Sequence, residues 1–158
     1  MKKIRIYLFS SCLLFFIIDR ISKSLIIYKF SNAQISEIKI NSFFNLILVW
    51  NRGVGFGFLP FDSNTSYLFV SLFIALVNAF LIYWMLKKSK IVESFLISMI
   101  LGSSIGNLFD RFYYGLVPDF IDLYYKNLHW FTFNVADIFI TIGIVCLILS
   151  DILIKKKI

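Results

Sequence analysis

Long uncharged apolar runs constrain this chain more than any other feature. The run Leu68–Leu86 has only two strongly polar side chains, Ser71 and Asn78, and the run Ile138–Ser150 carries no charge. A helix needs about 20 predominantly apolar residues to cross about 30 Å of hydrocarbon. We therefore predict an all-α polytopic membrane protein with four transmembrane helices, near residues 6–28, 67–86, 92–111 and 131–154.

The composition excludes an ordinary soluble domain and a disordered chain. Only 16% of the 158 residues are charged and 59% are hydrophobic, whereas a soluble domain is about 25% charged and about 45–50% apolar. Disordered chains lack such apolar and aromatic content. The length suits one unit, so we expect a single integral membrane domain over residues 1–158.

The basic residues predict the orientation of the helices. Nine of them fall on one side of a four-span arrangement: Lys2, Lys3, Arg5, Lys87, Lys88, Lys90, Lys155, Lys156 and Lys157. Cytoplasmic loops are enriched in Lys and Arg, so both termini should be cytoplasmic. This arrangement accounts for the net charge of +7 without a nucleic-acid partner. Asp19 and Arg20 follow the first apolar run where a cleaved signal peptide needs small residues, so the first helix should remain as a span.

Two outer segments, residues 30–66 and 112–130, should connect the spans. In the first, Phe43–Trp50 is too short to span and is typical of a strand, so we expect a small outer β-containing segment between helices 1 and 2. Gly53, Gly55 and Gly57 follow it and indicate a bend. Asp62 and Asp122 are expected to be solvated loop charges.

Acidic residues also occur where the membrane would make them costly. Asp19, Asp110 and Asp137 fall within the predicted spans or at their outer ends, and Asp119 falls in the short loop just above. A carboxylate at the centre of a span costs about 2.5–3.5 kcal/mol and usually marks a functional site. With a rise of about 1.5 Å per residue, Asp19 and Asp137 reach nearly the same depth in the outer leaflet.

The spacing of the polar residues places them on shared helix faces. The pairs and triplet at helical spacing are Asp19 with Lys23, Asn107 with Asp110 and Arg111, and Asn134 with Asp137. A common interior pocket is the favoured explanation. A structural ion pair for Asp19 and Lys23, and interhelical hydrogen bonds for Asn134 and Asp137, are the alternatives. Gly102 and Gly106 predict close helix packing.

Carboxylates are the chemistry that the remaining residue types favour. His129 is the single histidine and no Cys/His cluster accompanies it, so we expect no metal site and no cofactor. The chain has no G-x-S-x-G elbow, and no serine is clearly placed to react with Lys23. Two carboxyl groups held together share one proton, so one can activate water while the other protonates the substrate.

Five motifs in this chain resemble those of the lipoprotein signal peptidases, the bacterial type II signal peptidases. They are Asp19–Lys23 (D-Q-x-x-K in the family), Asn51–Gly57 (N-x-G-x-[AS]-F-[GS]), Gly102–Arg111 (G-G-x-x-G-N-x-x-D-R), Val117–Phe120 (V-x-D-F) and Phe133–Asp137 (F-N-x-A-D). The motifs occur in the family's order along nearly the whole chain. Three positions depart from them, with Arg20 in place of Gln, Ser103 in place of Gly and Gly55 in place of Ala or Ser.

The resemblance implies a metal-free aspartic peptidase of the bacterial inner membrane, with its site on the outer side. Its substrates would be prolipoproteins, cleaved before a diacylglyceryl-modified cysteine, with membrane lipid as the other partner and a monomer as the expected state. The catalytic pair would be Asp119 and Asp137. The other site residues carried over are Asn107, Arg111 and Asn134 for substrate or dyad orientation, Asn51 and Gly53 for the outer cradle, and Asp19, Lys23 and Asp110 as structural groups, with Arg111 holding Asp110 ionised.

Two other classes of protein remain as alternatives at this point. Intramembrane Asp and Lys residues also suit a proton-coupled transporter, which should show paired repeats and broken helices. A non-catalytic membrane scaffold should tolerate the loss of Asp119 or Asp137.

Overall fold

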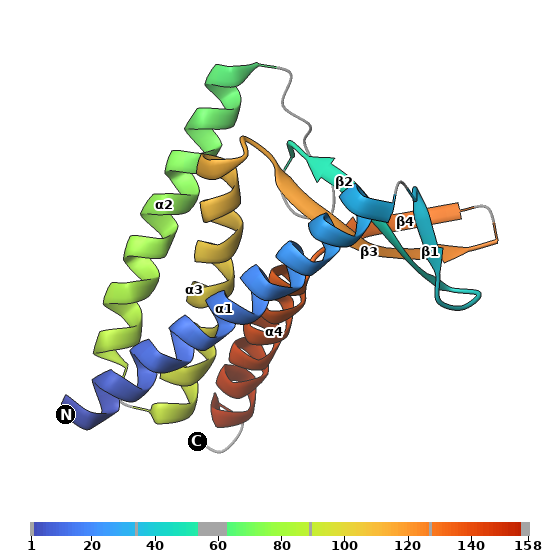
Figure 1. Ribbon diagram of the computed structural model, residues 1–158. Helices are drawn as coiled ribbons and strands as arrows, with labels where there is room; N and C mark the ends of the chain where they lie inside the picture. Colours follow the sequence, from blue (N-terminus) through green and yellow to red (C-terminus); the bar gives the residue numbers. More distant parts are fainter. Residues whose placement is uncertain (1, 34, 54–62, 89, 127, 156–158) are drawn as a thin grey trace.

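The computed structural model contains a helical bundle with a small sheet at one end (Figure 1). It describes residues 2–33, 35–53, 63–88, 90–126 and 128–155. Within those ranges the elements are α1 (Lys2–Ala33), β1 (Glu37–Lys39), β2 (Phe44–Asn51), α2 (Asn64–Lys87), α3 (Ile91–Tyr113), β3 (Val117–Tyr125), β4 (Leu128–Phe133) and α4 (Val135–Lys155). Gly55, Gly57 and Asp62, for which a bend and a solvated charge were predicted, lie outside the described residues.

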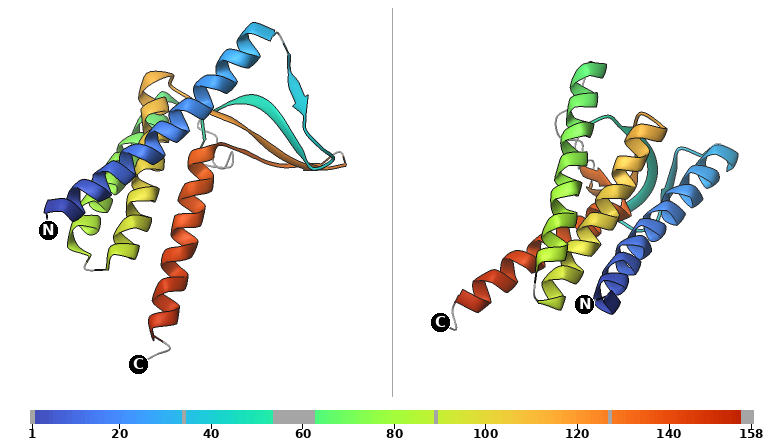
Figure 2. Two further views of the ribbon diagram at one scale, coloured as in Figure 1. Left: turned by 60° about the horizontal axis from the view of Figure 1, so that its bottom comes forward. Right: turned by 90° about the vertical axis from the view of Figure 1, so that its left-hand side faces the viewer.

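Helix α3 is the centre of the bundle and packs against α1, α2 and α4 (Figures 1 and 2). Small residues allow α1 to approach it closely, as predicted. A Cβ atom on Gly102 would lie 2.2 Å from the backbone oxygen of Cys12, and one on Gly106 would lie 2.3 Å from Oδ2 of Asp19. Both glycines therefore fix the distance between α1 and α3.

Three of the described helices, α2, α3 and α4, are long and apolar enough to cross a membrane. Large apolar side chains of α2 such as Phe69 and Leu76 are exposed on the outside of the bundle. A lipid environment suits such a surface, because soluble proteins rarely expose large apolar areas to water. Helix α1 is also long, but it carries Asp19, Arg20 and Lys23 within its apolar stretch.

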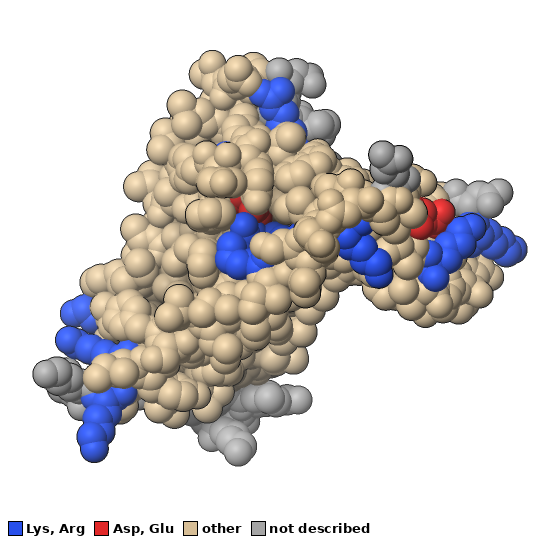
Figure 3. All heavy atoms as spheres, viewed as in Figure 1, with Lys and Arg blue, Asp and Glu red and all other residues tan. Residues whose placement is uncertain are grey.

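Basic side chains lie at both ends of the bundle, but at the sheet end acidic side chains accompany them (Figure 3). Both termini and the α2–α3 connection lie at one end, and the sheet lies at the other (Figure 1). The exposed basic side chains at the end that holds the N-terminus include Arg5, Lys87 and Lys90, and those at the sheet include Lys39 and Lys126. The sheet and the end that holds the N-terminus are therefore separated by the length of the helices.

The four-stranded antiparallel sheet has the order β1-β2-β3-β4. Strand β2 confirms the strand predicted for Phe43–Trp50. The prediction for the second outer segment was wrong, because residues expected to be a loop form β3 and β4. Both outer segments thus build one sheet, and the β structure is not confined to the segment between helices 1 and 2.

Two sequence-based placements change as a result. Asp119 lies in strand β3 and not in a loop, because β3 is an inner strand that pairs with β2 and β4. Helix α4 begins at Val135 and not near residue 131, because Leu128–Phe133 pairs with β3. Asp122 is fully buried beside His129 (Oδ2 to Nδ1, 2.7 Å), so the prediction of a solvated charge was also wrong.

Candidate active site

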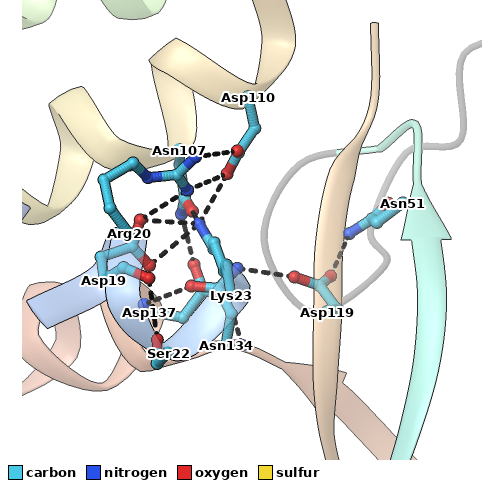
Figure 4. Close-up of polar contacts among 10 residues, drawn as sticks. All are labelled: Asp19, Arg20, Ser22, Lys23, Asn51, Asn107, Asp110, Asp119, Asn134 and Asp137. Atoms are coloured by element: carbon cyan, nitrogen blue, oxygen red, sulfur yellow. Dashed lines mark hydrogen bonds and ion pairs between the residues drawn. The ribbon is translucent and has the colours of Figure 1, made fainter. Parts of the chain in front are cut away.

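The polar residues predicted from the motifs gather where α1, α3 and α4 meet the sheet (Figure 4). They come from five elements that are far apart along the chain. Figure 4 shows Asp19, Arg20, Ser22 and Lys23 of α1, Asn51 of β2, Asn107 and Asp110 of α3, Asp119 of β3, and Asn134 and Asp137 at the start of α4. Hydrogen bonds and ion pairs connect these groups into one network.

The start of α4 positions Asp137. The side-chain Oδ1 of Asn134 accepts a hydrogen bond from the backbone N–H of Asp137 (3.2 Å), and Oδ2 of Asp137 accepts one from the backbone N–H of Asn134 (3.1 Å). This reciprocal pair is a capping box, which satisfies two backbone donors at a helix N-terminus. The Phe133–Asp137 motif therefore starts the helix and fixes one carboxyl group at its amino end, where negative charge is stabilised.

Asn134 also reaches the second carboxyl group. Its Nδ2 donates to Oδ1 of Asp119 (2.6 Å), while Nδ2 of Asn51 donates to Oδ2 of the same residue (2.8 Å). Oδ1 of Asn51 in turn accepts from the backbone N–H of Gly53 (2.6 Å). One asparagine side chain thus links Asp119 to Asp137, and strand β2 supports Asp119 from the other side.

Asn107 connects Asp137 to the charged residues of α1. Its Nδ2 donates to Oδ1 of Asp137 (2.9 Å), and its Oδ1 accepts from Nζ of Lys23 (2.5 Å). An ammonium group is only a donor, so the contact with Lys23 orients the amide. The NH₂ group of Asn107 consequently faces Asp137.

Ion pairs between α1 and α3 adjoin Asn107. Nζ of Lys23 is 2.9 Å from Oδ1 of Asp19 and 2.7 Å from Oδ2 of Asp110, and all three side chains are almost completely buried. The predicted pairing of Asp19 with Lys23 is confirmed. Arg20 adds contacts to Asp110 (2.5 Å) and Asp19 (2.9 Å).

Arg111 does not hold Asp110, contrary to the prediction. Its Nη2 donates to the backbone oxygen of Gly53 (2.5 Å), and its guanidinium lies 5.4 Å from the ring centre of Tyr67. Asp110 pairs with Arg20 and Lys23 instead. Nε and Nη1 of Arg111 are buried and have no hydrogen-bond partner among the residues that the structure describes.

Asp119 is 2% exposed, so it is almost completely shielded from water. Burial, followed by the nearby negative charge of Asp137, raises the pKa of Asp119 from 3.8 to about 7. The N–H donors of Asn51 and Asn134 lower the pKa but do not offset the loss of hydration. Such a carboxyl group can hold a proton near neutral pH, which a general acid requires.

A hollow in the sheet gives access to Asp119. It has a volume of about 460 Å³ and is lined by residues of β2, β3 and β4 and the turn after β2, among them Asn51, Gly53, Asp119 and Trp130. Pockets of about 300–1,000 Å³ are typical of sites for small ligands or parts of larger ones. The hollow places Asp119 at the wall of a space that a substrate segment can enter.

Arg20 is the charged member of this network to which the sequence analysis assigns no role in the site. In the sequence this residue is a departure from the D-Q-x-x-K motif and a charge that argues against a cleaved signal peptide. Its main partner, Asp110, lies 90 positions further along the chain, so local spacing contained no signal for the contact. Only the close approach of α1 to α3 reveals it.

The fold and the site together define a helical membrane protein with two linked carboxyl groups between its helices and a small sheet. A model of the family described as signal peptidase (SPase) II matches residues 11–153. The chain belongs to this family, whose members are proteases.

Curated relatives are similar over most of the chain. A protein of Pelagibacter ubique (strain HTCC1062) named lipoprotein signal peptidase is 43% identical over 146 residues, which are 92% of this chain and 87% of the relative. A lipoprotein signal peptidase of Francisella tularensis subsp. novicida (strain U112) is 39% identical over 77% of each chain. One of Cupriavidus necator (strain H16) is 37% identical, over 89% of this chain and 79% of the relative.

Solved structures show the same fold. Two structures of a bacterial membrane enzyme, both determined by the in meso method, align with TM-scores of 0.75 and 0.72. The first is 24% identical and covers 95% of this chain and 89% of its own chain, and the second is 23% identical and covers 91% of each. These matches establish the shared architecture of bundle and sheet.

Proposed function

We propose that this chain is a membrane aspartic endopeptidase that removes signal peptides from prolipoproteins, cleaving before a diacylglyceryl-modified cysteine. Membership of the signal peptidase II family supports the substrate class. The observation that carries the mechanism is the link through Asn134, whose side chain contacts Asp119 while its backbone and side chain fix Asp137. Two carboxyl groups joined in this way are suited to act as an acid–base pair.

In the proposed mechanism Asp137 begins ionised and Asp119 protonated. Asp137 takes a proton from water as the water oxygen bonds to the scissile carbonyl carbon, and Asp119 protonates the carbonyl oxygen. Asp137 then gives its proton to the amide nitrogen as the C–N bond breaks. Asp119 recovers a proton from the hydroxyl of the tetrahedral intermediate, which leaves both residues in their starting forms.

The neighbouring polar residues have supporting roles in this proposal. Asn107 and Asn51 hold Asp137 and Asp119, respectively, by N–H hydrogen bonds. Nε and Nη1 of Arg111, which have no hydrogen-bond partner among the described residues, would donate to substrate carbonyl oxygens, next to the Gly53 backbone that Arg111 already contacts. Asp19, Lys23 and Asp110 would brace the helices on which these groups stand.

The proposed arrangement in the membrane follows the charge distribution. Residues 1–158 would form one domain that crosses a bacterial inner membrane four times, with both termini in the cytoplasm. The basic side chains at the end opposite the sheet support this orientation. The sheet and Asp119 would then face the outer side, where the acylated cysteine of a prolipoprotein keeps its acyl chains in the outer leaflet. We propose a monomer that uses neither metal nor cofactor.

Cleavage of a purified diacylglyceryl-modified prolipoprotein tests the proposal. We expect the wild-type protein to release the signal peptide, and the variants Asp119→Asn and Asp137→Asn each to reduce turnover by at least about a thousandfold, because neither amide can exchange a proton with water or the leaving amine. The matched control is Asp151→Asn, an exposed acid on α4 far from the sheet, which should keep wild-type turnover. Wild-type turnover in either site variant would refute the proposed pair.

If Asp110→Asn abolished turnover while Asp119→Asn did not, the pair would have to be reassigned to Asp110 and Asp137. Substrate binding, measured with the inactive variants, separates loss of chemistry from loss of folding. Both site variants should still bind the lipid-modified substrate.

A further inference from the structure

Arg20 is a largely buried cation that the proposed reaction does not use. Its side chain is 17% exposed. Nη1 donates to Oδ1 of Asp110 (2.5 Å) and Nη2 to Oδ2 of the same carboxylate (2.7 Å), and Nη2 also reaches Oδ2 of Asp19 (2.9 Å). The guanidinium also lies 5.0 Å from the ring centre of Phe109. Figure 4 shows this side chain reaching from α1 toward Asp110 on α3.

The two parallel bonds to Asp110 depend on the shape of an arginine side chain. A planar guanidinium binds both oxygens of a carboxylate at once, which gives a defined geometry as well as attraction. A glutamine at position 20 has one NH₂ group and no charge, and a lysine has charge but no planar fork. Arg20 therefore fixes the orientation of the Asp110 carboxylate in a way that neither replacement reproduces.

The orientation of Asp110 matters for Lys23. Nζ of Lys23 donates to Oδ2 of Asp110 (2.7 Å) and also to Oδ1 of Asn107 (2.5 Å). Asn107 then directs its NH₂ group to Asp137. A continuous series of contacts thus runs from Arg20 through Asp110, Lys23 and Asn107 to the carboxyl group proposed as the base.

Arg20 also balances the charges of the buried ion pairs between α1 and α3. Asp19 and Asp110 carry two negative charges, and Arg20 and Lys23 carry two positive charges, so the four buried groups sum to zero. Without Arg20 the sum would be −1 beside Asp137 and Asp119. The other charged or titratable groups near the pair are the same in either case. Arg52 and His129 line the hollow with Asp119, Asp122 lies beside His129, and Arg111 on α3 contacts the backbone of Gly53.

We propose that Arg20 is a positioning residue of the peptidase site, which orients Asp110 and Lys23 toward Asn107 and cancels the second negative charge near the catalytic pair. The role rests on the proposed function, because it is expressed through the Asp119–Asp137 pair. Arg20 touches neither carboxyl group of that pair, so its effect should appear in the pH dependence of turnover and in kcat more than in KM.

The test compares Arg20→Gln, Arg20→Lys and the control Arg5→Gln, an exposed arginine on the same helix, in cleavage of the diacylglyceryl-modified prolipoprotein from pH 5 to pH 9. Loss of a nearby cation disfavours the ionised carboxylates, so Arg20→Gln should shift the pH profile of turnover toward higher pH by about 0.5–1 pH unit. This shift is smaller than the 1–3 units that a directly contacting cation produces. We expect kcat at pH 7 to fall at least about tenfold, with KM within about twofold. Arg20→Lys should keep the wild-type profile position with a smaller loss of kcat, and Arg5→Gln should change neither.

The double variant Arg20→Gln/Asp110→Asn adds a second readout. It removes one positive and one negative charge, so the remaining pair, Asp19 and Lys23, is again neutral, and the pH profile should return toward the wild-type position. Thermal unfolding of every variant identifies any that are not folded at the assay temperature. If Arg20→Gln is not folded at the assay temperature, the pH profiles of the double variant and of Arg20→Lys are compared with that of the wild type instead.

Three results would overturn the role of Arg20 while the proposed function stands. They are a wild-type profile and kcat in Arg20→Gln, an equal shift in Arg20→Gln and Arg20→Lys, and a shift in the double variant as large as in Arg20→Gln. Absence of cleavage by the wild-type protein at every pH would instead overturn the proposed function, and this role with it.

Discussion

Replacing Asp119 by asparagine is expected to stabilise the folded protein at alkaline pH, although it removes a group that the proposed reaction needs. The pKa of Asp119 is 3.8 in an exposed chain and about 7 in the folded protein. Between these pH values the folded protein holds a proton that the unfolded chain has lost, so wild-type stability falls as pH rises from about 4 to about 7. The loss is complete above pH 7, and asparagine does not titrate.

The size of the effect follows from the shift. One pKa unit corresponds to about 1.4 kcal/mol, so a shift from 3.8 to about 7 gives at most about 4 kcal/mol in total. From pH 5 to pH 8 the stability of Asp119→Asn relative to the wild type should therefore increase by up to about 3 kcal/mol. In Asp119→Asn the new side-chain NH₂ would face the NH₂ of either Asn51 or Asn134, which now donate to the two oxygens of Asp119. Loss of that hydrogen bond costs about 1 kcal/mol of stability. That cost is the same at both pH values and cancels in the comparison.

Thermal unfolding of the purified proteins in detergent at pH 5 and pH 8 provides the measurement. The midpoint of Asp119→Asn should rise relative to the wild type between the two conditions, whereas the exposed control Asp151→Asn should show no such change. A midpoint difference between Asp119→Asn and wild type that is the same at pH 5 and pH 8 would refute the reasoning. It would mean that Asp119 is ionised in the folded protein at both pH values.

Three further predictions concern turnover and packing. Turnover of the wild-type protein should fall about tenfold per pH unit above pH 7, as Asp119 loses its proton, and a rate that is constant from pH 7 to pH 9 would contradict this. Gly106→Ala should lower both the unfolding midpoint and turnover, because its Cβ would lie 2.3 Å from Oδ2 of Asp19; wild-type values for both would show that α1 can move away without cost. Asn78→Leu should raise the free energy of unfolding by about 1–2 kcal/mol, because neither side-chain polar atom of this buried residue has a partner among the described residues. A lower midpoint on thermal unfolding would indicate that the Asn78 side chain is hydrogen-bonded in the native protein.

The helices and the polar pairs on one helix face could be predicted from the sequence, because both depend on local patterns. Uncharged runs mark the helices, and the spacing of Asp19 and Lys23 on one helix face predicts their pairing, which the structure confirms. The faces of Asn107 and Asp137 were likewise readable from helical spacing, and the two side chains meet.

Contacts between distant segments could not be predicted in the same way. Strand β3 contains Pro118, Asp119 and Asp122, which are uncommon in strands, and it is stabilised by pairing with β2, which lies some 70 positions earlier. The partner of Arg20 is similarly distant. The choice of Arg20 over Arg111 as the partner of Asp110 depends on how closely α1 approaches α3, which spacing within one helix cannot express.

The capping box at the start of α4 makes the proposed chemistry depend on a single helical turn. Helix ends fray more readily than helix interiors, and local opening needs far less free energy than global unfolding. If the first turn of α4 opened, Asn134 and Asp137 would lose their mutual hydrogen bonds, and Asp119 would lose its contact with Asn134. Mild denaturation should therefore inactivate the protein while the bundle around α3 is still intact.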